Sequence, residues 1–419
     1  MELLKWLYPG MHVKRWILLL LAGITTLGLG IAYLLVDFYR QQPLPPAFYY
    51  LTLQFVSRLG RALLFGIAGL SLIVISLVGL NRSLLSAFPQ IQQERLVDAM
   101  YRRRVRRRGP KIVVIGGGTG LSTLLRGLKE FTDHLTGIVT VADDGGSSGR
   151  LRRDMGVLPP GDFRQCITAL ADAEPLMSQL MQYRFGNGDL GGHSFGNLFL
   201  AAMSEISGSF EEGLRQSSRV LAVRGRVVPS TLENVVLCAE LANQRVVHGE
   251  SKVPCGGAAV RRVFLEPAEA RAYPEAVSAI LHADLIVIGP GSLYTSILPN
   301  LLVREIRAAI DAARAPVVYV CNVATQPGET DDYDITDHVE ALIQHIGPDL
   351  AVDIVLADSG PPPPFPPAWG ATPVWAHSDF VATTPVVTRS LRSSTRPTRH
   401  DSAKLAQAII ELYENDLTD

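Results

Sequence analysis

The segment KIVVIGGGTGLS, residues 111–122, joins a β-branched run to a glycine-rich turn. Residues 111–115 fit a buried parallel strand, and residues 124–129 fit a helix. A strand, a glycine turn and a helix N-terminus together place backbone N–H groups where a phosphate can bind. The fold class predicted from this segment is α/β, with a Rossmann-like, doubly wound and mostly parallel sheet. The candidate ligand-binding residues are Gly117, Gly118, Thr119, Gly120 and Ser122.

The glycine turn does not complete the dinucleotide-binding fingerprint, because Leu121 stands where that fingerprint requires glycine. A tight strand-to-helix turn without a ligand is therefore an alternative interpretation. A nicotinamide-dependent oxidoreductase ranks last among the function classes for the same reason.

A second strand-to-loop junction strengthens the prediction of a ligand site. The apolar run GIVTVA, residues 137–142, leads into DDGGSSG at 143–149. Asp143 and Asp144 then lie at a strand's carboxyl end, where carboxylates bind a ribose or help to hold Mg²⁺. Asp, Gly and Ser are also ordinary turn residues, so a solvated turn is the competing interpretation.

Further loops of the same kind follow along the chain. PPGDFR (159–164) and GGHSFGN (191–197) precede expected helices, whereas GPGSLYTS (289–296) and TQPGET (325–330) follow the apolar runs 284–288 and 317–322. Strands that end in such loops indicate a site along the carboxyl edge of a parallel sheet. We interpret His193 as a general acid/base or as a phosphate contact. The added candidates are Gly161, Asp162, Arg164, His193, Ser194, Asn197, Gly291, Ser292, Tyr294 and Thr295.

The N-terminal part differs in composition. Residues 16–36 contain no charged side chain and, at about 1.5 Å per residue, are long enough to cross a hydrocarbon core of roughly 30 Å. Residues 62–80 form a second apolar run, and basic residues flank the pair. We predict a transmembrane hairpin anchor at 1–82, a basic juxtamembrane linker at 83–109 and a ligand-binding domain at 110–419. The basic flanks predict a multi-pass protein of the cell membrane with both termini and the domain in the cytoplasm.

The arginine-rich segment 102–108 serves as a topology determinant or an anionic-lipid contact in this interpretation. No nucleic-acid partner is expected, because no RNA- or DNA-binding signature accompanies it. The four cysteines are widely spaced and form no CxxC pair, which argues against a disulfide framework or a structural zinc site. A membrane hairpin also raises the local concentration of domains, which favours a homodimer.

The ordered set GGGTGLS, ADDGGSSGRLR, PPGDFR, GHSFGNL, GPGSLYTSILPNLL and TQPGET, with Arg399-His400-Asp401 near the end, resembles the YvcK family of gluconeogenesis factors. That family is similar in turn to CofD, the 2-phospho-L-lactate transferase. The resemblance implies a cytoplasmic regulator that binds a UDP-sugar such as UDP-N-acetylglucosamine. It also implies support of cell shape, cell-wall synthesis and gluconeogenic growth, with cell-wall synthesis proteins as partners.

The resemblance also assigns residues near the C-terminus. It implies that Arg399 contacts the nucleotide sugar and that Trp369, in an unusually proline-rich segment, stands where relatives carry tyrosine. It places Ser402 where relatives carry a phosphorylatable threonine, although an ordinary helix-start position is the simpler interpretation. A ligand-sensing regulator is thus the first function class. A metal-dependent transferase like CofD, using Asp143 and Asp144 with Mg²⁺, is the second.

Overall fold

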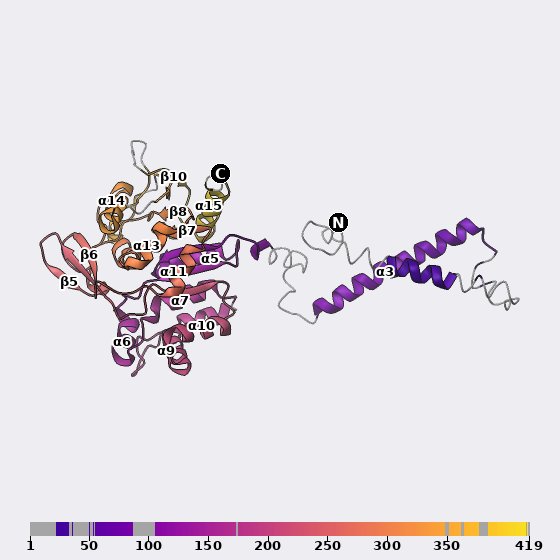
Figure 1. The fold of residues 1–419 in the computed structure, drawn as a ribbon, viewed down its shortest axis with the longest axis horizontal. Helices are drawn as coiled ribbons and strands as arrows, with labels where there is room; N and C mark the ends of the chain where they lie inside the picture. The colour runs from indigo at the N-terminus through magenta and orange to yellow at the C-terminus, as the bar shows by residue number, and fades with distance from the viewer. Residues whose placement is uncertain are drawn as a thin grey trace. The chain divides into compact units, whose positions relative to one another are not determined.

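The computed structural model describes residues 22–32, 36, 50, 53, 55–86, 105–172, 175–347, 352–361, 364–376, 384–415 and 417. The chain divides into two units, Met1–Arg104 and Val105–Asp419, and each unit is described by itself. The boundary falls a few residues before the predicted domain start at 110. Figure 1 shows the two units and the element labels used below.

The first unit contains α3 (Arg58–Ser86) and a helical stretch at residues 22–32. Across the residues of this unit that are described, no helix combines the length and the apolar character needed to cross a bilayer. The predicted spans at 16–36 and 62–80 are therefore not confirmed. Residues 16–21 and 33–35 of the first span, and 87–104 of the predicted linker, lie outside the described residues.

The second unit is built on a seven-stranded sheet whose strands all pair in parallel, in the order β10-β9-β8-β7-β1-β2-β3. Its strands are β1 Ile112–Gly116, β2 Leu135–Val139, β3 Arg226–Pro229, β7 Leu285–Ile288, β8 Val317–Val320, β9 Ile354–Asp358 and β10 Val386–Arg389. The order runs outward in both directions from β1 and β7. The predicted doubly wound α/β class is confirmed, and the switch point of the sheet lies between these two strands.

Helices cover the sheet, so every residue of β1, β2, β7, β8 and β9 is buried. Continuous apolar runs such as IVVIG and LIVI follow from burial on both faces. The helix α5 packs against α7 and α15, and α11 packs against α13. The helices are α5 Gly118–Leu128, α6 Gly146–Met155, α7 Pro160–Leu170, α8 Pro175–Gln182, α9 Phe195–Ser207, α10 Phe210–Val220, α11 Pro274–Leu281, α12 Leu298–Leu301, α13 Arg304–Ala312, α14 Ile335–Ile346 and α15 Ser402–Asn415.

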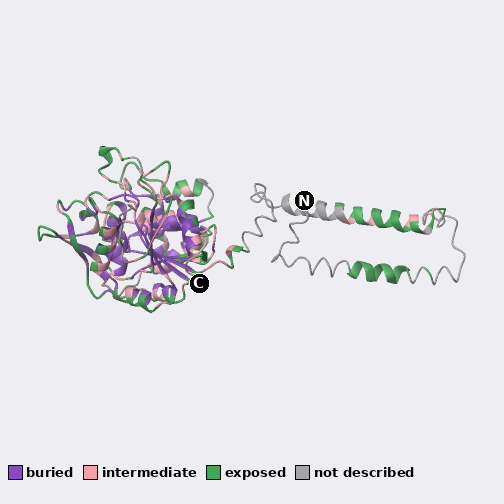
Figure 2. Cartoon of the chain, turned by 90° about the horizontal axis from the view of Figure 1, so that it is seen from above, coloured by how far each residue is buried: buried purple, intermediate pink, exposed green. Residues whose placement is uncertain are grey.

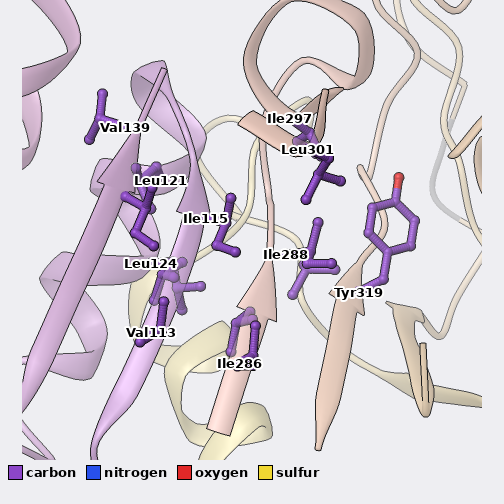
Figure 3. Close-up of a cluster of buried hydrophobic side chains, with 14 of the residues drawn as sticks. Val113, Ile115, Leu121, Leu124, Val139, Ile286, Ile288, Ile297, Leu301 and Tyr319 are labelled. Atoms are coloured by element: carbon purple, nitrogen blue, oxygen red, sulfur yellow. The ribbon is translucent and has the colours of Figure 1, made fainter. Parts of the chain in front are cut away.

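The hydrophobic core fills the space around the central strands, and Figure 2 shows the strands buried while the surface loops are exposed. Figure 3 shows Leu121 and Leu124 of α5 beside β1, with Ile297 and Leu301 close to β7 and β8. Leu121 is fully buried in this core. The residue that breaks the dinucleotide fingerprint is therefore a packing residue of α5.

A small antiparallel sheet, with strand order β5-β4-β6, lies between β3 and β7 in the sequence. Its strands are β4 Val236–Leu241, β5 Val246–His248 and β6 Val260–Glu266. The short 3₁₀ turn η3 (Glu250–Lys252) follows β5 directly. This excursion matters for the site, because it brings η3 to the edge of the main sheet.

Candidate functional site

A cleft of about 850 Å³ lies where β1 and β7 end, at the switch point of the sheet. Ligand sites of α/β sheets favour this position, and the volume is within the usual range for small-molecule pockets. The cleft brings together many of the residues predicted from the sequence, namely Gly117, Gly118, Thr119, Gly120, Asp143, Asp162, Gly291, Ser292, Thr295, Trp369 and Arg399.

The two glycine turns approach each other too closely for side chains at the contact. A Cβ atom on Gly120 would lie 2.4 Å from the carbonyl oxygen of Pro290 and 2.9 Å from the Cα of Gly291. Glycine at position 120 therefore permits contact between two segments of the chain itself. Packing within the chain therefore accounts for the glycine at position 120, and no ligand is needed to explain it.

One of the backbone donors expected to bind phosphate is already used within the chain. The Gly118 N–H donates to the Asp162 carboxylate at 2.7 Å. Burial, together with the smaller effect of the nearby Asp143 charge, raises the pKa of Asp162 to about 7. The amide of Gly291 similarly faces the Asn322 side chain, which donates back to the Gly291 carbonyl at 2.8 Å. The expected convergence of free amide groups is thus only partly present.

The cleft has an acidic side formed by Asp143, Asp162 and Glu250. Burial raises the pKa of Glu250 to about 8, with further contributions from the charges of Asp143 and Asp162. Burial also raises the pKa of Asp143, against a hydrogen bond of 2.9 Å from the Gly145 N–H. Carboxylates with raised pKa values in a cleft are typical of functional sites, although structural networks produce them as well.

Asp144 does not line the cleft with Asp143, contrary to the prediction that the two carboxylates act as a pair. Its Oδ1 accepts the Ser251 N–H at 2.9 Å, and its carboxylate lies beside Gly249. Asp144 therefore holds the turn that carries Glu250. The sequence offered no motif for Glu250, because it comes from the antiparallel excursion rather than from a strand-end loop of the main sheet.

The cleft lining also contains basic and aromatic residues. Arg396 and Arg399 are exposed cleft residues, and neither forms a salt bridge with any residue that the structure describes. Trp369 lines the cleft while 46% exposed, with its ring centroid 5.5 Å from that of Phe365. Arg396 was missed from the sequence, since the resemblance pointed only to Arg399.

The three residues that follow Arg399 have structural roles. His400 faces the Cys321 carbonyl at 3.2 Å, and burial lowers its pKa to about 4, so the ring stays neutral at physiological pH. Asp401 caps α15 by accepting the N–H groups of Ala403 and Lys404 at 3.0 and 3.1 Å. Ser402 donates its hydroxyl to the Thr123 carbonyl at 2.8 Å and so joins α15 to α5.

A group of predicted site residues forms a buried polar network that does not line the cleft. Arg164 donates through Nε to Asn197 Oδ1 at 2.9 Å, and Asn197 donates to Ser147 Oγ at 3.1 Å. The same hydroxyl lies 3.0 Å from His193 Nδ1, and Ser194 caps α9. Burial, followed by the Arg150 charge, lowers the pKa of His193. These residues join α6, α7 and α9.

Three other candidates also stand away from the cleft. Tyr294 is buried and its hydroxyl lies 2.7 Å from that of Tyr333. Ser122 is buried and donates to the Thr119 carbonyl. Gly161 lets the start of α7 approach Ser148, whose Oγ accepts its N–H at 3.1 Å. Hydrogen bonds and close packing within the chain therefore account for these three residues without a ligand.

The network makes a prediction that separates stability from binding. We expect Asn197→Ala to lower the free energy of unfolding by about 2–3 kcal/mol, because it leaves Arg164 and Ser147 without their shared partner. Urea denaturation measures this loss. Ligand affinity of the folded variant should match that of the wild type, and a large loss of affinity without loss of stability would contradict the structural role.

Three carboxyl groups in or near the cleft, those of Asp162, Glu250 and Glu329, whose carboxylate accepts the Thr295 hydroxyl, make a second prediction, on the pH dependence of stability. The folded-state pKa values of Asp162, Glu250 and Glu329 are raised to about 7, 8 and 7, chiefly by burial. Between the unfolded and folded pKa values the folded state binds more protons, so stability falls as pH rises. We expect the melting temperature to drop by a few degrees from about pH 6.5 to 8, the upper part of that interval. Asp162→Asn should flatten this slope in thermal melts, and an unchanged slope would contradict the assignment.

Buried histidines have the opposite effect on the pH dependence of stability, but only at lower pH. Burial lowers the pKa of His338 and His400, so their protonation destabilises the fold as pH falls below about 6.5. Melts taken between about pH 6.5 and 8 therefore isolate the contribution of the carboxyl groups.

The parallel doubly wound sheet with a cleft at its switch point defines an α/β protein of the Rossmann-like class. The model of the family described as 2-phospho-L-lactate transferase CofD matches residues 112–372, and the chain belongs to this CofD family. This confirms the family resemblance seen in the sequence.

Individual relatives agree. The gluconeogenesis factor of Bacillus subtilis is 55% identical over 251 residues, covering 60% of this chain and 79% of the relative. A relative from Nostoc sp. is 49% identical over 368 residues, covering 85% of this chain and 79% of its own length. A crystal structure of a UPF0052 family member from Bacillus halodurans superposes with a TM-score of 0.68 at 44% identity, covering 72% of this chain and 99% of that one.

Proposed function

We propose that this chain is a regulator that binds a nucleotide sugar of the UDP-N-acetylglucosamine type in the switch-point cleft. The observation that carries the proposal is the charged lining of this cleft, which contains Arg396 and Arg399 as well as Asp143, Asp162 and Glu250. A diphosphate matches the two arginines, since guanidinium groups bind phosphate oxygens in charge-assisted hydrogen bonds. The exposed indole of Trp369 offers a stacking surface for a base or sugar ring.

In this proposal, ligand binding changes the contacts that this chain makes with other proteins and thereby regulates them. In this proposal the ligand-bound form supports cell shape, cell-wall synthesis and growth under gluconeogenic conditions, acting on cell-wall synthesis proteins. The names of the relatives, gluconeogenesis factors, support the metabolic part of the proposal.

A second candidate function is a metal-dependent phosphate-group transferase like the enzyme that names the family. The acidic side of the cleft favours it, because an all-oxygen donor set suits Mg²⁺. Asp143 and Glu250 would hold the ion, whose charge would neutralise phosphate oxygens. Asp144 does not belong to this set, because it is engaged with the Ser251 amide.

Turnover distinguishes the two functions. Full-length chain is incubated with UDP-N-acetylglucosamine and Mg²⁺ while ³¹P nuclear magnetic resonance follows the two diphosphate signals. The regulator predicts saturable binding with both signals retained, and Asp143→Asn should then change affinity only. With water or an added alcohol as the acceptor, loss of the two diphosphate signals in favour of new phosphate-ester signals would replace the regulator with the transferase, provided that Asp143→Asn abolishes the change.

We also propose that the first unit anchors the protein in the cell membrane, with both termini and the second unit in the cytoplasm. The apolar runs 16–36 and 62–80 and the flanking basic residues support this. Apolar side chains of α3, such as Leu63, Phe65 and Ile67, are more than half exposed and are suited to lipid contact. Anchoring would also favour a homodimer of the cytoplasmic units.

Membrane attachment predicts the behaviour of two chains in an alkaline carbonate wash of cell membranes. The full-length chain should stay in the membrane pellet, because an integrated apolar hairpin resists high pH. A chain of residues 105–419 should appear in the supernatant. Release of the full-length chain by carbonate would contradict the anchor.

A further inference from the structure

The small antiparallel sheet brings three metal-ligand side chains together, away from the cleft residues described above. Cys238 lies on the central strand β4 and pairs directly with His248 of β5. Glu266 of β6 pairs with Val236, two residues before Cys238. Directly paired residues, and residues two apart on a strand, share one face of a sheet. The strand register therefore places all three side chains on the same face.

Their ligand atoms converge on one point. His248 Nδ1 lies 3.2 Å from Cys238 Sγ and 3.3 Å from Glu266 Oε2, and all three atoms lie within 4.8 Å of one another. Tetrahedral zinc with bonds of about 2.0–2.3 Å has ligand-to-ligand edges of roughly 3.3–3.8 Å. The distances from His248 Nδ1 to the other two ligand atoms are therefore close to those between the ligands of a zinc ion.

The geometry argues against a nucleophile activated by a histidine. Such a triad uses both ring nitrogens, one for the nucleophile and the other for the orienting carboxylate. Here Cys238 and Glu266 both face the same nitrogen, Nδ1. One proton on that nitrogen serves only one of them well, whereas a cation placed between the three atoms binds all of them.

We propose that Cys238, His248 and Glu266 form a Zn²⁺ site that joins the three strands of the small sheet. A thiolate, an imidazole and a carboxylate suit zinc and are a poor set for Mg²⁺ or Ca²⁺. Cys238 is buried, whereas the His248 and Glu266 side chains are 55% and 52% exposed, so the fourth coordination position faces solvent. Three protein ligands with an open position are typical of zinc sites that bind water or a small ligand.

The proposed ion also acts on the neighbouring turn. His248 is followed by Gly249, whose N–H donates to the Leu237 carbonyl at 2.8 Å, and then by Glu250, which lines the cleft. Zinc would hold β5 against β4 at the point where the chain leaves for that turn. The zinc proposal does not rest on the proposed nucleotide-sugar binding, because the three zinc ligands lie outside the cleft lining.

Cobalt substitution provides the test. Full-length chain, freed of metal with a chelator, is titrated with Co²⁺, and absorption is recorded. We expect one Co²⁺ per chain, a thiolate-to-cobalt charge-transfer band and the visible bands of four-coordinate cobalt. Zn²⁺ should displace it and Mg²⁺ should not. Absence of the thiolate band would overturn the proposal.

Variants assign the ligands. Cys238→Ser should abolish the charge-transfer band, and His248→Gln or Glu266→Gln should weaken Zn²⁺ binding at least 10-fold in competition with a chromophoric chelator. Cys255→Ser is the matched control, because Cys255 is an exposed free thiol outside the cluster. His248→Gln alters an exposed side chain, so its metal-free melting temperature should match the wild type and keep the test valid if Cys238→Ser misfolds. An equal loss of Zn²⁺ affinity in Cys255→Ser, or wild-type Zn²⁺ affinity in His248→Gln, would overturn the assignment.

Discussion

Gly120→Ala should destabilise the second unit by at least about 3 kcal/mol, a large part of the stability of an ordinary domain. The added methyl would lie 2.4 Å from the Pro290 carbonyl oxygen and 2.7 Å from the Pro290 carbonyl carbon. Both are backbone atoms that close the turn after β7, so relief requires the two turns to separate. Because those turns line the cleft, any folded fraction should also bind ligand poorly. Urea denaturation monitored by circular dichroism measures the loss.

Gly116→Ala is the matched control for this substitution. It adds the same methyl four residues earlier, where the nearest heavy atoms would lie 3.7 Å away, an ordinary contact. Its stability should stay within about 1 kcal/mol of the wild type. Equal stability of the two variants would show that the turns are not in close contact.

Arg399→Ala should weaken binding of UDP-N-acetylglucosamine roughly 10- to 100-fold, the usual effect of losing a charge-assisted hydrogen bond to phosphate. The side chain is exposed and forms no salt bridge among the described residues, so the melting temperature should not change. Calorimetric titration of the full-length chain measures the affinity.

Arg389→Ala is the control for the loss of one positive charge. Arg389 is also exposed, but it lies on β10 and outside the cleft lining. Its affinity should match the wild type. If both variants lost affinity equally, general electrostatic attraction would replace the assigned contact.

The fold was largely predictable from the sequence, because apolar runs indicate buried strands and glycine-rich segments indicate the turns that follow them. The predicted strands at 111–115 and 284–288 correspond to β1 (Ile112–Gly116) and β7 (Leu285–Ile288). The turns that follow them meet at the switch point, as parallel topology requires. The antiparallel sheet of β4, β5 and β6 was not predicted, since no turn motif marks it.

The site was predicted only in part, because a motif gives residue types without the direction of each side chain. Asp143 and Asp144 are adjacent, yet one faces the cleft and the other holds the Ser251 amide. His193 and Asn197 resembled ligand residues because buried networks and binding sites use the same polar side chains. Glu250 and the Cys238 cluster depend on strand pairing between distant segments, which spacing along the chain does not reveal.

The proposed function requires that the switch-point cleft, with its arginines and carboxylates, binds a nucleotide sugar. Isothermal titration calorimetry of the full-length chain with UDP-N-acetylglucosamine, UDP and N-acetylglucosamine measures this binding. We expect one saturable site per chain for the nucleotide sugar, weaker binding of UDP, and loss of most of the affinity in a chain carrying Arg396→Ala and Arg399→Ala together. No heat with any of the nucleotides, or unchanged affinity in the double variant, would contradict it.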